Sequence, residues 1–154
     1  YTVRGPLAMG ARLAGASEGQ LRVLERFAAP LGIAFQLRDD LLGTFGDPTA
    51  TGKPAGSDLR QGKRTALLVE ADGQGDVEVY LARAMAAPPE DDAPVRELQA
   101  LLESLGARER VEARLEALLD EARGALTGPA AALLAASGRR LLEGAVDALG
   151  ARER

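Results

Sequence analysis

The chain has no segment in which apolar and polar residues alternate as they do along a half-buried β-strand. Its 154 residues are rich in Ala, Leu, Gly and Arg, and only 3% are aromatic, so the core must be aliphatic. Ala, Leu and Arg are among the residues that favour a helix. A chain of this length can form one compact domain with its own core. We therefore expect an all-α fold.

Glycine and proline divide the chain into its expected helices. The first runs from about Pro6 to Ala16, and Ser-Glu-Gly-Gln at 17–20 has the pattern of a capping box that begins a second helix. Pro30 removes a hydrogen bond, so this helix should kink or break near residue 28, and a third should cover about 31–42. Further helices are expected over about 63–71, 76–86, 93–105 and 107–126, and a last one reaches about 149 with an interruption near 137–138.

Between residues 43 and 62 the density of glycine and proline rules out a continuous helix. A loop of about twenty residues is longer than most connections in a compact domain, and such loops are more often functional or disordered than idle. Its lysine, aspartate and glycine residues favour a functional loop.

One narrow polar stripe lies on the helix expected before this loop. At 100° per residue, Gln36, Asp39, Asp40 and Gly43 fall within about a quarter of the helix circumference, and apart from Arg38 the other positions are apolar. A helix that is apolar almost all round is expected to be buried. Buried carboxylates need a metal ion or a group of lysines beside them. The alternative is that the two aspartates lie near the helix end and simply reach solvent.

The loop supplies positive charge that could meet these carboxylates. Lys53 lies between Gly52 and Pro54, and Asp58 precedes the run Gly-Lys-Arg-Thr at 62–65. Two lysines and a helix N-terminus facing two carboxylates would suit a polyanion bridged by divalent cations. Diphosphate with Mg²⁺ fits, since Mg²⁺ prefers oxygen ligands and bridges carboxylates to phosphates. Taken alone, the lysines would be ordinary surface charges.

Composition excludes several other classes of site. The chain has no Cys and no His, which excludes disulfides, thiol nucleophiles, imidazole catalysis and zinc sites built on those ligands. A net charge of -4 gives no reason to expect a nucleic-acid partner. No apolar run approaches the roughly 20 residues of a membrane span, and no secretory signal is recognised, so we expect a cytoplasmic protein. Because residue 1 is Tyr and the first helix lacks a cap, we also expect a truncated or processed chain.

A run of motifs over some thirty residues closely resembles the second aspartate-rich region of the polyprenyl synthases, which include farnesyl and geranylgeranyl diphosphate synthases. The resemblance rests on Phe35–Gly43, Gly46-Asp47-Pro48, Gly52-Lys53-Pro54, Ser57-Asp58-Leu59 and Gly62-Lys63-Arg64-Thr65. The run Tyr1–Leu7 also resembles the family's helix that follows a Lys-Thr or Lys-Ser pair. The resemblance implies an antiparallel helical bundle of the isoprenoid synthase type, with residues 1–154 as the C-terminal half of a single domain that forms a homodimer.

The resemblance also implies a reaction, in which isopentenyl diphosphate is condensed with an allylic diphosphate held by Mg²⁺ between two acidic motifs. Asp39 would be a direct Mg²⁺ ligand and Asp40 its supporting acidic partner. Together with Gln36 and Lys53 they form the expected catalytic set.

Further residues would bind substrate if the resemblance holds. Lys53 and Lys63 would bind diphosphate oxygens, and Gln36 would contact substrate or bound water. Phe35 would line the isopentenyl side. Tyr1 and Thr2 would lie on the cavity wall. Asp58 is expected to order the lysine loop rather than to touch the metal.

The sequence departs from the family's pattern at two points. Gly43 stands where the third aspartate of the second motif is expected, which we interpret as a tolerated variant. No Asp-Asp-x-x-Asp motif occurs anywhere, and the acidic run at 90–92 is expected to face solvent. Half of a metal cage cannot neutralise the leaving diphosphate, so this chain alone should be inactive and should need the N-terminal half of the same synthase.

Two other classes of protein would also fit an all-α chain of this kind. One is a noncatalytic helical subunit of a hetero-oligomeric prenyl synthase, although such a subunit has no need to keep Asp39, Asp40, Lys53 and Lys63. The other is a terpene cyclase, but the Gly-Lys-Pro loop at 52–54 matches synthases better.

Overall fold

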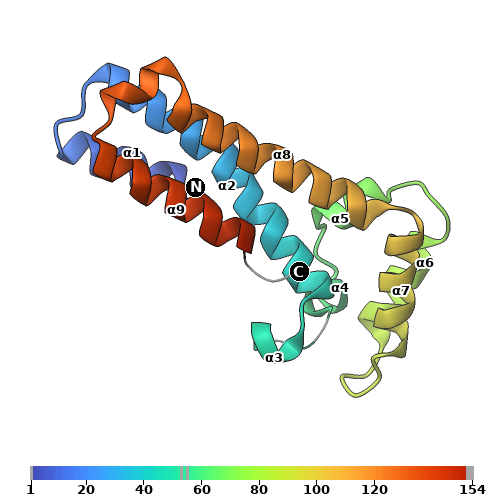
Figure 1. Ribbon diagram of the computed structural model, residues 1–154. Helices are drawn as coiled ribbons and strands as arrows, with labels where there is room; N and C mark the ends of the chain where they lie inside the picture. Colours follow the sequence, from blue (N-terminus) through green and yellow to red (C-terminus); the bar gives the residue numbers. More distant parts are fainter. Residues whose placement is uncertain (1, 53, 55, 152–154) are drawn as a thin grey trace. The chain divides into compact units, whose positions relative to one another are not determined.

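The computed structural model describes residues 2–52, 54 and 56–151, and every regular element within them is helical (Figure 1). This confirms the all-α prediction. The elements are α1 (Arg4–Leu13), α2 (Glu18–Phe45), α3 (Pro48–Thr51), α4 (Ser57–Arg60), α5 (Ala66–Glu70), α6 (Val77–Ala86), α7 (Ala93–Ser104), α8 (Ala107–Thr127), the 3₁₀ helix η1 (Pro129–Leu133) and α9 (Ala136–Ala151). None of the described helices combines the length and apolar character that a membrane span requires.

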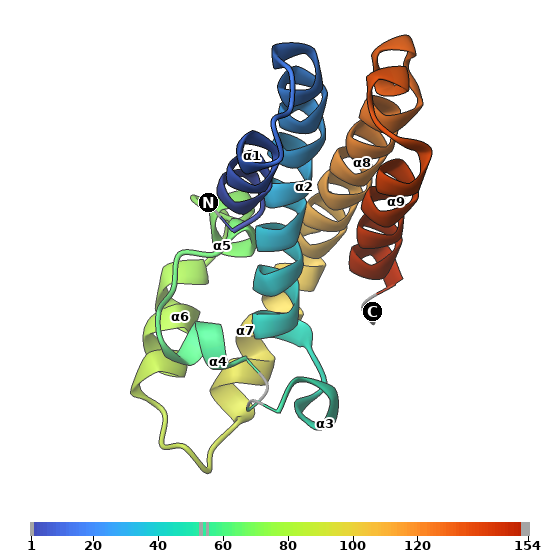
Figure 2. The same ribbon diagram turned by 90° about the vertical axis from the view of Figure 1, so that its left-hand side faces the viewer.

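The chain divides into two compact units, to both of which α2 and α8 contribute. The first unit comprises residues 1–36 and 114–154. In it, α1 runs antiparallel to the beginning of α2, and the end of α8 runs antiparallel to α9 (Figures 1 and 2). Its core is aliphatic apart from one phenylalanine and includes Phe27, Leu115, Leu119, Leu126 and Val146, all at most 1% exposed. The expected antiparallel bundle is therefore present.

The capping box at the start of α2 is formed as predicted. The Ser17 amide donates to Gln20 Oε1 at 2.8 Å, and the Gln20 amide donates to Ser17 Oγ at 3.3 Å. The Gln20 side chain also donates to the carbonyl oxygen of Leu133 at 3.0 Å. The same side chain therefore caps α2 and ties its first turn to η1.

The predicted break at Pro30 is wrong, because α2 continues through Pro30 from Glu18 to Phe45. Proline removes one intrahelical donor, but the helix on both sides of it is held by burial of Phe27, Ala28, Leu31 and Ala34, each at most 5% exposed. Packing of this face outweighs the lost hydrogen bond.

A second boundary was also misplaced in the prediction. The last helix was expected to be interrupted near residues 137–138, but these residues lie in the first turn of α9. The interruption comes earlier, between the end of η1 at Leu133 and the start of α9 at Ala136.

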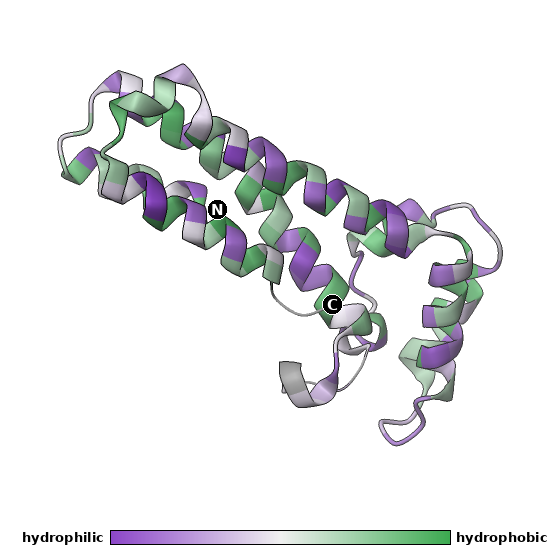
Figure 3. Cartoon of the chain, viewed as in Figure 1, coloured by the Kyte–Doolittle hydropathy of each residue, from purple (hydrophilic) through white to green (hydrophobic). Residues whose placement is uncertain are grey.

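The side chains of α8 show how the long helices are packed. Its buried residues are Ala107, Val111, Leu115, Leu119, Ala122 and Leu126, which recur every three or four positions. Figure 3 shows polar and apolar residues alternating around the turns of α8 and α9. This is the pattern of an amphipathic helix with one face in a core.

The second unit, residues 37–113, is built from shorter pieces. The stretch predicted as a loop contains two single-turn helices, α3 and α4, and α5 starts at Ala66 rather than near residue 63. Asp47 caps α3, since its Oδ1 accepts from the Thr49 amide at 2.7 Å. Helix α6 packs against α4 and α7. The unit's own core includes Leu59, Leu67, Leu98 and Leu102, none of which is exposed.

Candidate metal and diphosphate site

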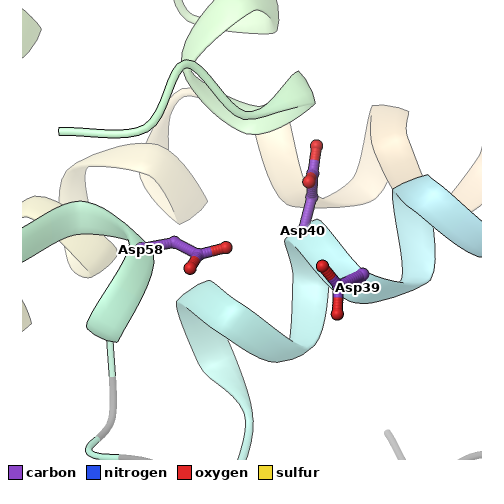
Figure 4. Close-up of side chains that lie close together, drawn as sticks. All are labelled: Asp39, Asp40 and Asp58. Carbon is purple, nitrogen blue, oxygen red and sulfur yellow. The ribbon is translucent and has the colours of Figure 1, made fainter. Parts of the chain in front are cut away.

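Three carboxylates of the second unit lie close together (Figure 4). Asp39 and Asp40 come from the later turns of α2 and Asp58 from α4, and one oxygen of each lies within 4.8 Å of the others. Oxygens on opposite sides of one Mg²⁺ are about 4.2 Å apart, so a small adjustment or a bridging water would suffice to share an ion. Asp40 and Asp58 are buried, at 8% and 3% exposed, whereas Asp39 is exposed. The alternative in which both aspartates of α2 reach solvent is therefore wrong for Asp40.

Asp40 connects α2 to the start of α5. Its Oδ2 accepts a hydrogen bond from the Ala66 amide at 2.8 Å. The first amides of a helix have no partner inside it, and the Thr65 side chain makes no cap for α5. A carboxylate at a helix N-terminus is also favoured by the helix dipole. Asp40 therefore acts as a cap from another helix and holds α5 beside the carboxylates.

Lys63 provides positive charge at the cluster. Its Nζ donates to Asp58 Oδ1 at 2.5 Å, and the lysine side chain is half exposed while that of Asp58 is 5% exposed. The hydrogen bond to Asp58 raises the pKa of the Lys63 ammonium; desolvation lowers the pKa, and the charges of Asp58, Asp39 and Asp40 raise it further. Lys63 is thus a charged group with one end at the cluster and access to solvent.

Helix α4, which carries Asp58, is held firmly in the second unit. Gly56, just before it, has the left-handed φ of 65°, and a side chain there would clash with Val95. Arg60 at the other end donates to Asp92 Oδ1 at 2.6 Å and to the carbonyl oxygen of Asp91 at 2.8 Å. The acidic run at 90–92 is exposed, as predicted, and Asp92 in it pairs with Arg60.

Gly43 is where the carboxyl group of Asp58 meets α2. A Cβ built on Gly43 would lie 2.5 Å from Asp58 Cγ and 3.2 Å from its Oδ1, with Oδ2 closer still. The position of the missing third aspartate is thus occupied by Asp58. Sequence reasoning assigned Asp58 to the lysine loop and missed this contact. The glycine at position 43 was the one sign in the sequence that another group could lie against α2 there.

The other predicted site residues belong to the first unit or lie outside the described residues. Thr2 and Phe35 both line a cavity of about 480 Å³ in the first unit, whose other walls include Phe27, Leu31 and Leu142. This brings together Thr2, which was predicted for a cavity wall, and Phe35, which was predicted for the isopentenyl side. Tyr1 and Lys53 lie outside the described residues.

The prediction that α2 is buried almost all round is wrong along one face. Ala29, Ile33, Gln36 and Asp39 are all exposed and follow one another at helical spacing. Ile33 alone is 47% exposed. Gln36 therefore lies on an open face of α2.

Comparison with known proteins identifies the family to which this chain belongs. The family model for polyprenyl synthetase matches residues 1–102, which include all three clustered carboxylates and Lys63. The chain belongs to the polyprenyl synthetase family. A geranylgeranyl diphosphate synthase of Mycobacterium tuberculosis is 39% identical over 126 residues, covering 75% of this chain and 36% of that protein. A geranylfarnesyl diphosphate synthase of Aeropyrum pernix is 34% identical over 119 residues, covering 77% and 37%.

Solved structures extend the likeness to nearly the whole of this chain. A geranylgeranyl pyrophosphate synthase from Corynebacterium glutamicum, complexed with isoprenyl diphosphate and magnesium, has a TM-score of 0.83 and 33% identity. The match covers 99% of this chain and 43% of that one. A polyprenyl synthetase from Streptomyces coelicolor A3(2) has a TM-score of 0.77 and 31% identity. The chain thus spans little more than a third of the curated relatives named above, and less than half of the first of these solved chains.

Proposed function

We propose that the complete polypeptide containing this chain is a prenyltransferase that condenses isopentenyl diphosphate with an allylic diphosphate to give a longer prenyl diphosphate. The observation that supports this most is the cluster of Asp39, Asp40 and Asp58 with Lys63, within the residues that match the polyprenyl synthetase family. Oxygen donors of this kind suit Mg²⁺ and the diphosphate it bridges.

In this reaction the bond between the allylic carbon and the diphosphate oxygen breaks, and its electron pair leaves with the diphosphate. The double bond of isopentenyl diphosphate supplies the electrons of the new carbon–carbon bond, and loss of a proton restores a double bond. Bound Mg²⁺ would neutralise charge on the departing diphosphate. Asp39 would hold the ion directly, and Asp40, fixed by its bond to the Ala66 amide, would support it.

Lys63 is proposed to bind diphosphate oxygens. Its side chain is half exposed and its pKa is raised, so it presents an ammonium that can leave Asp58 for a phosphate oxygen. We assign Lys53 to the same task from its place in the Gly-Lys-Pro motif, and Gln36, on the open face of α2, to substrate or water.

The apolar cavity of the first unit is proposed to contact the hydrocarbon part of a substrate. Phe35 and Thr2 line it together with aliphatic side chains, a surface that suits an isoprenoid chain. Tyr1 is assigned to the same wall from its neighbour Thr2.

The second acidic wall of the active site is proposed to come from the N-terminal half of the same synthase. No Asp-Asp-x-x-Asp motif occurs in the 154 residues, so the charge of the leaving diphosphate would be neutralised from one side only. We further propose that the complete polypeptide forms a homodimer, as the family resemblance implies, and that it is cytoplasmic.

Incorporation of radiolabelled isopentenyl diphosphate into prenyl product tests this function. The complete polypeptide should form product with an allylic diphosphate and Mg²⁺, and a verified preparation of the 154-residue chain should form none. Product from the 154-residue chain would contradict the need for a second acidic wall. No product from the complete polypeptide with any allylic diphosphate would contradict the function itself.

A further inference from the structure

We propose that Asp58 supplies the third carboxylate of this acidic site, and that Gly43 is required because it leaves room for that carboxylate. The inference rests on the proposed function for the identity of the ligand, a divalent cation with diphosphate. It differs from the expectation that the glycine is a tolerated loss and that Asp58 only orders a loop.

The space above Gly43 is filled by one group. Both oxygens and the Cγ of Asp58 lie within 3.2 Å of where a Cβ on Gly43 would be. Gly43 follows Asp39 by four positions and Asp40 by three, so it shares a helix face with both. The other interior glycine of α2, Gly32, is different: a Cβ there would meet only Val3, at an ordinary 3.9 Å.

Asp58 cannot easily make way for a side chain at position 43. Its side chain is 5% exposed, and its neighbour Leu59 is fully buried. The close approach of Gly56 to Val95 and the bonds of Arg60 to residues 91 and 92 fix α4 from both ends. An added methyl group would therefore push the carboxylate out of place, since packed interiors do not absorb extra atoms freely.

Asp58 brings a second buried carboxylate to the cluster: Asp40 is 8% and Asp58 3% exposed, while Asp39 is exposed. Placing like charges together away from water is costly without a compensating cation. Lys63 meets Asp58 with one ammonium, and a divalent cation, the ligand that the site is proposed to take, would offset the repulsion further.

The inference is tested by measuring Mn²⁺ binding to the complete polypeptide in the presence of inorganic diphosphate. The electron paramagnetic resonance signal of free Mn²⁺ reports how much of the ion is bound. Asp58→Ala should weaken Mn²⁺ binding by about 10- to 100-fold, the range for losing a group that supports a metal site. Gly43→Ala should weaken it to a similar degree although no charge is removed. Gly32→Ala, the matched control on the same helix, should leave it unchanged.

A swapped pair of residues makes the test specific. Gly43→Asp combined with Asp58→Ala moves the carboxylate from α4 to α2 and should bind Mn²⁺ within a few-fold of the unchanged protein. Gly43→Ala combined with Asp58→Ala should bind no worse than Asp58→Ala alone. Asp58→Asn, which keeps the size of the side chain and an acceptor for Lys63, should still lose affinity. Circular dichroism shows whether each variant is folded.

The possible failures are distinguishable. If Gly43→Ala and Asp58→Asn are folded and bind Mn²⁺ normally while Asp39→Ala does not, Asp58 has no part in the site and the inference is wrong. A swapped variant that binds no better than Asp58→Ala would also overturn it. If Asp39→Ala itself binds Mn²⁺ normally, the proposed function fails at this site.

Discussion

The two units of the chain differ in the length of their helices and in what those helices hold. The first unit uses long stretches of α2, α8 and α9 and lines a cavity with mainly apolar side chains. The second uses α4 and α5, of four and five residues, and brings together carboxylates and an ammonium. Every helix leaves about four amides unpaired at its start, so short helices offer more backbone donors per residue to charged groups.

This difference explains how the buried carboxylates of α2 and α4 are tolerated. Asp40 is stabilised by the first amide of α5, and Asp58 by the Lys63 that precedes α5. A continuous long helix through residues 57–70 would pair the Ala66 amide internally. The short helices thus position the charged side chains, whereas the long helices bury apolar side chains in the core.

The largest effect is expected when a carboxylate of the second unit is removed. Asp39→Ala in the complete enzyme should reduce kcat by about 100- to 1000-fold, the range for removing one group that stabilises charge in a transition state. Steady-state kinetics with saturating Mg²⁺ would measure it. Asp76→Ala, an exposed aspartate outside the cluster, is the control. Equal activity of the two variants would mean that Asp39 has no part in catalysis.

Packing in the first unit predicts the next largest effect. Leu119 is fully buried, so Leu119→Ala should lower the free energy of unfolding by about 2–5 kcal/mol. Leu141 is 77% exposed, and Leu141→Ala should change it by less than about 0.5 kcal/mol. Urea denaturation of both variants would measure the difference. Similar losses would mean that the packing of the first unit is misassigned.

Much of this fold could be predicted because its signals are local. The predicted helices at 76–86, 93–105 and 107–126 differ from α6, α7 and α8 by at most one residue at either end. Periodic apolar residues and flanking glycine or proline mark these boundaries within a few positions. Pro30 misled the prediction because the helix there depends on tertiary packing, which no local pattern shows.

The candidate site was predictable only in part for the same reason. Asp39, Asp40 and Lys63 could be named from motif spacing. The contact of Asp58 with Gly43 depends on where α4 lies, and α4 is anchored by Val95 and Asp92, more than thirty residues further along the chain. If Asp58 fills the space above Gly43, Gly43→Asp should reduce turnover of the complete enzyme substantially rather than be tolerated, because the new side chain would displace Asp58.

A smaller effect is expected when the positive charge of the second unit is removed. Lys63→Met should weaken binding of inorganic diphosphate by about 10-fold or more, since a hydrogen bond to a charged group contributes roughly 1.5–3 kcal/mol. Arg64→Met is the matched control, because Arg64 is the next residue, is 69% exposed and lies 3.9 Å from its carboxylate partner. Isothermal titration calorimetry of both variants would show the contrast. Equal weakening would indicate a general effect of charge rather than a site at Lys63.

The smallest effect is expected at the start of α2, where a long helix depends on one cap. Ser17→Ala removes the acceptor for the Gln20 amide and should lower the free energy of unfolding by about 1 kcal/mol. Ser17→Asn restores an acceptor of the type that N-caps favour and should recover most of the loss. The effect should stay small because the first unit is held mainly by its buried face, including Phe27 and Leu119. Thermal unfolding of both variants tests this, and a loss at Ser17→Ala as large as that at Leu119→Ala would show that capping, not packing, holds the long helices in place.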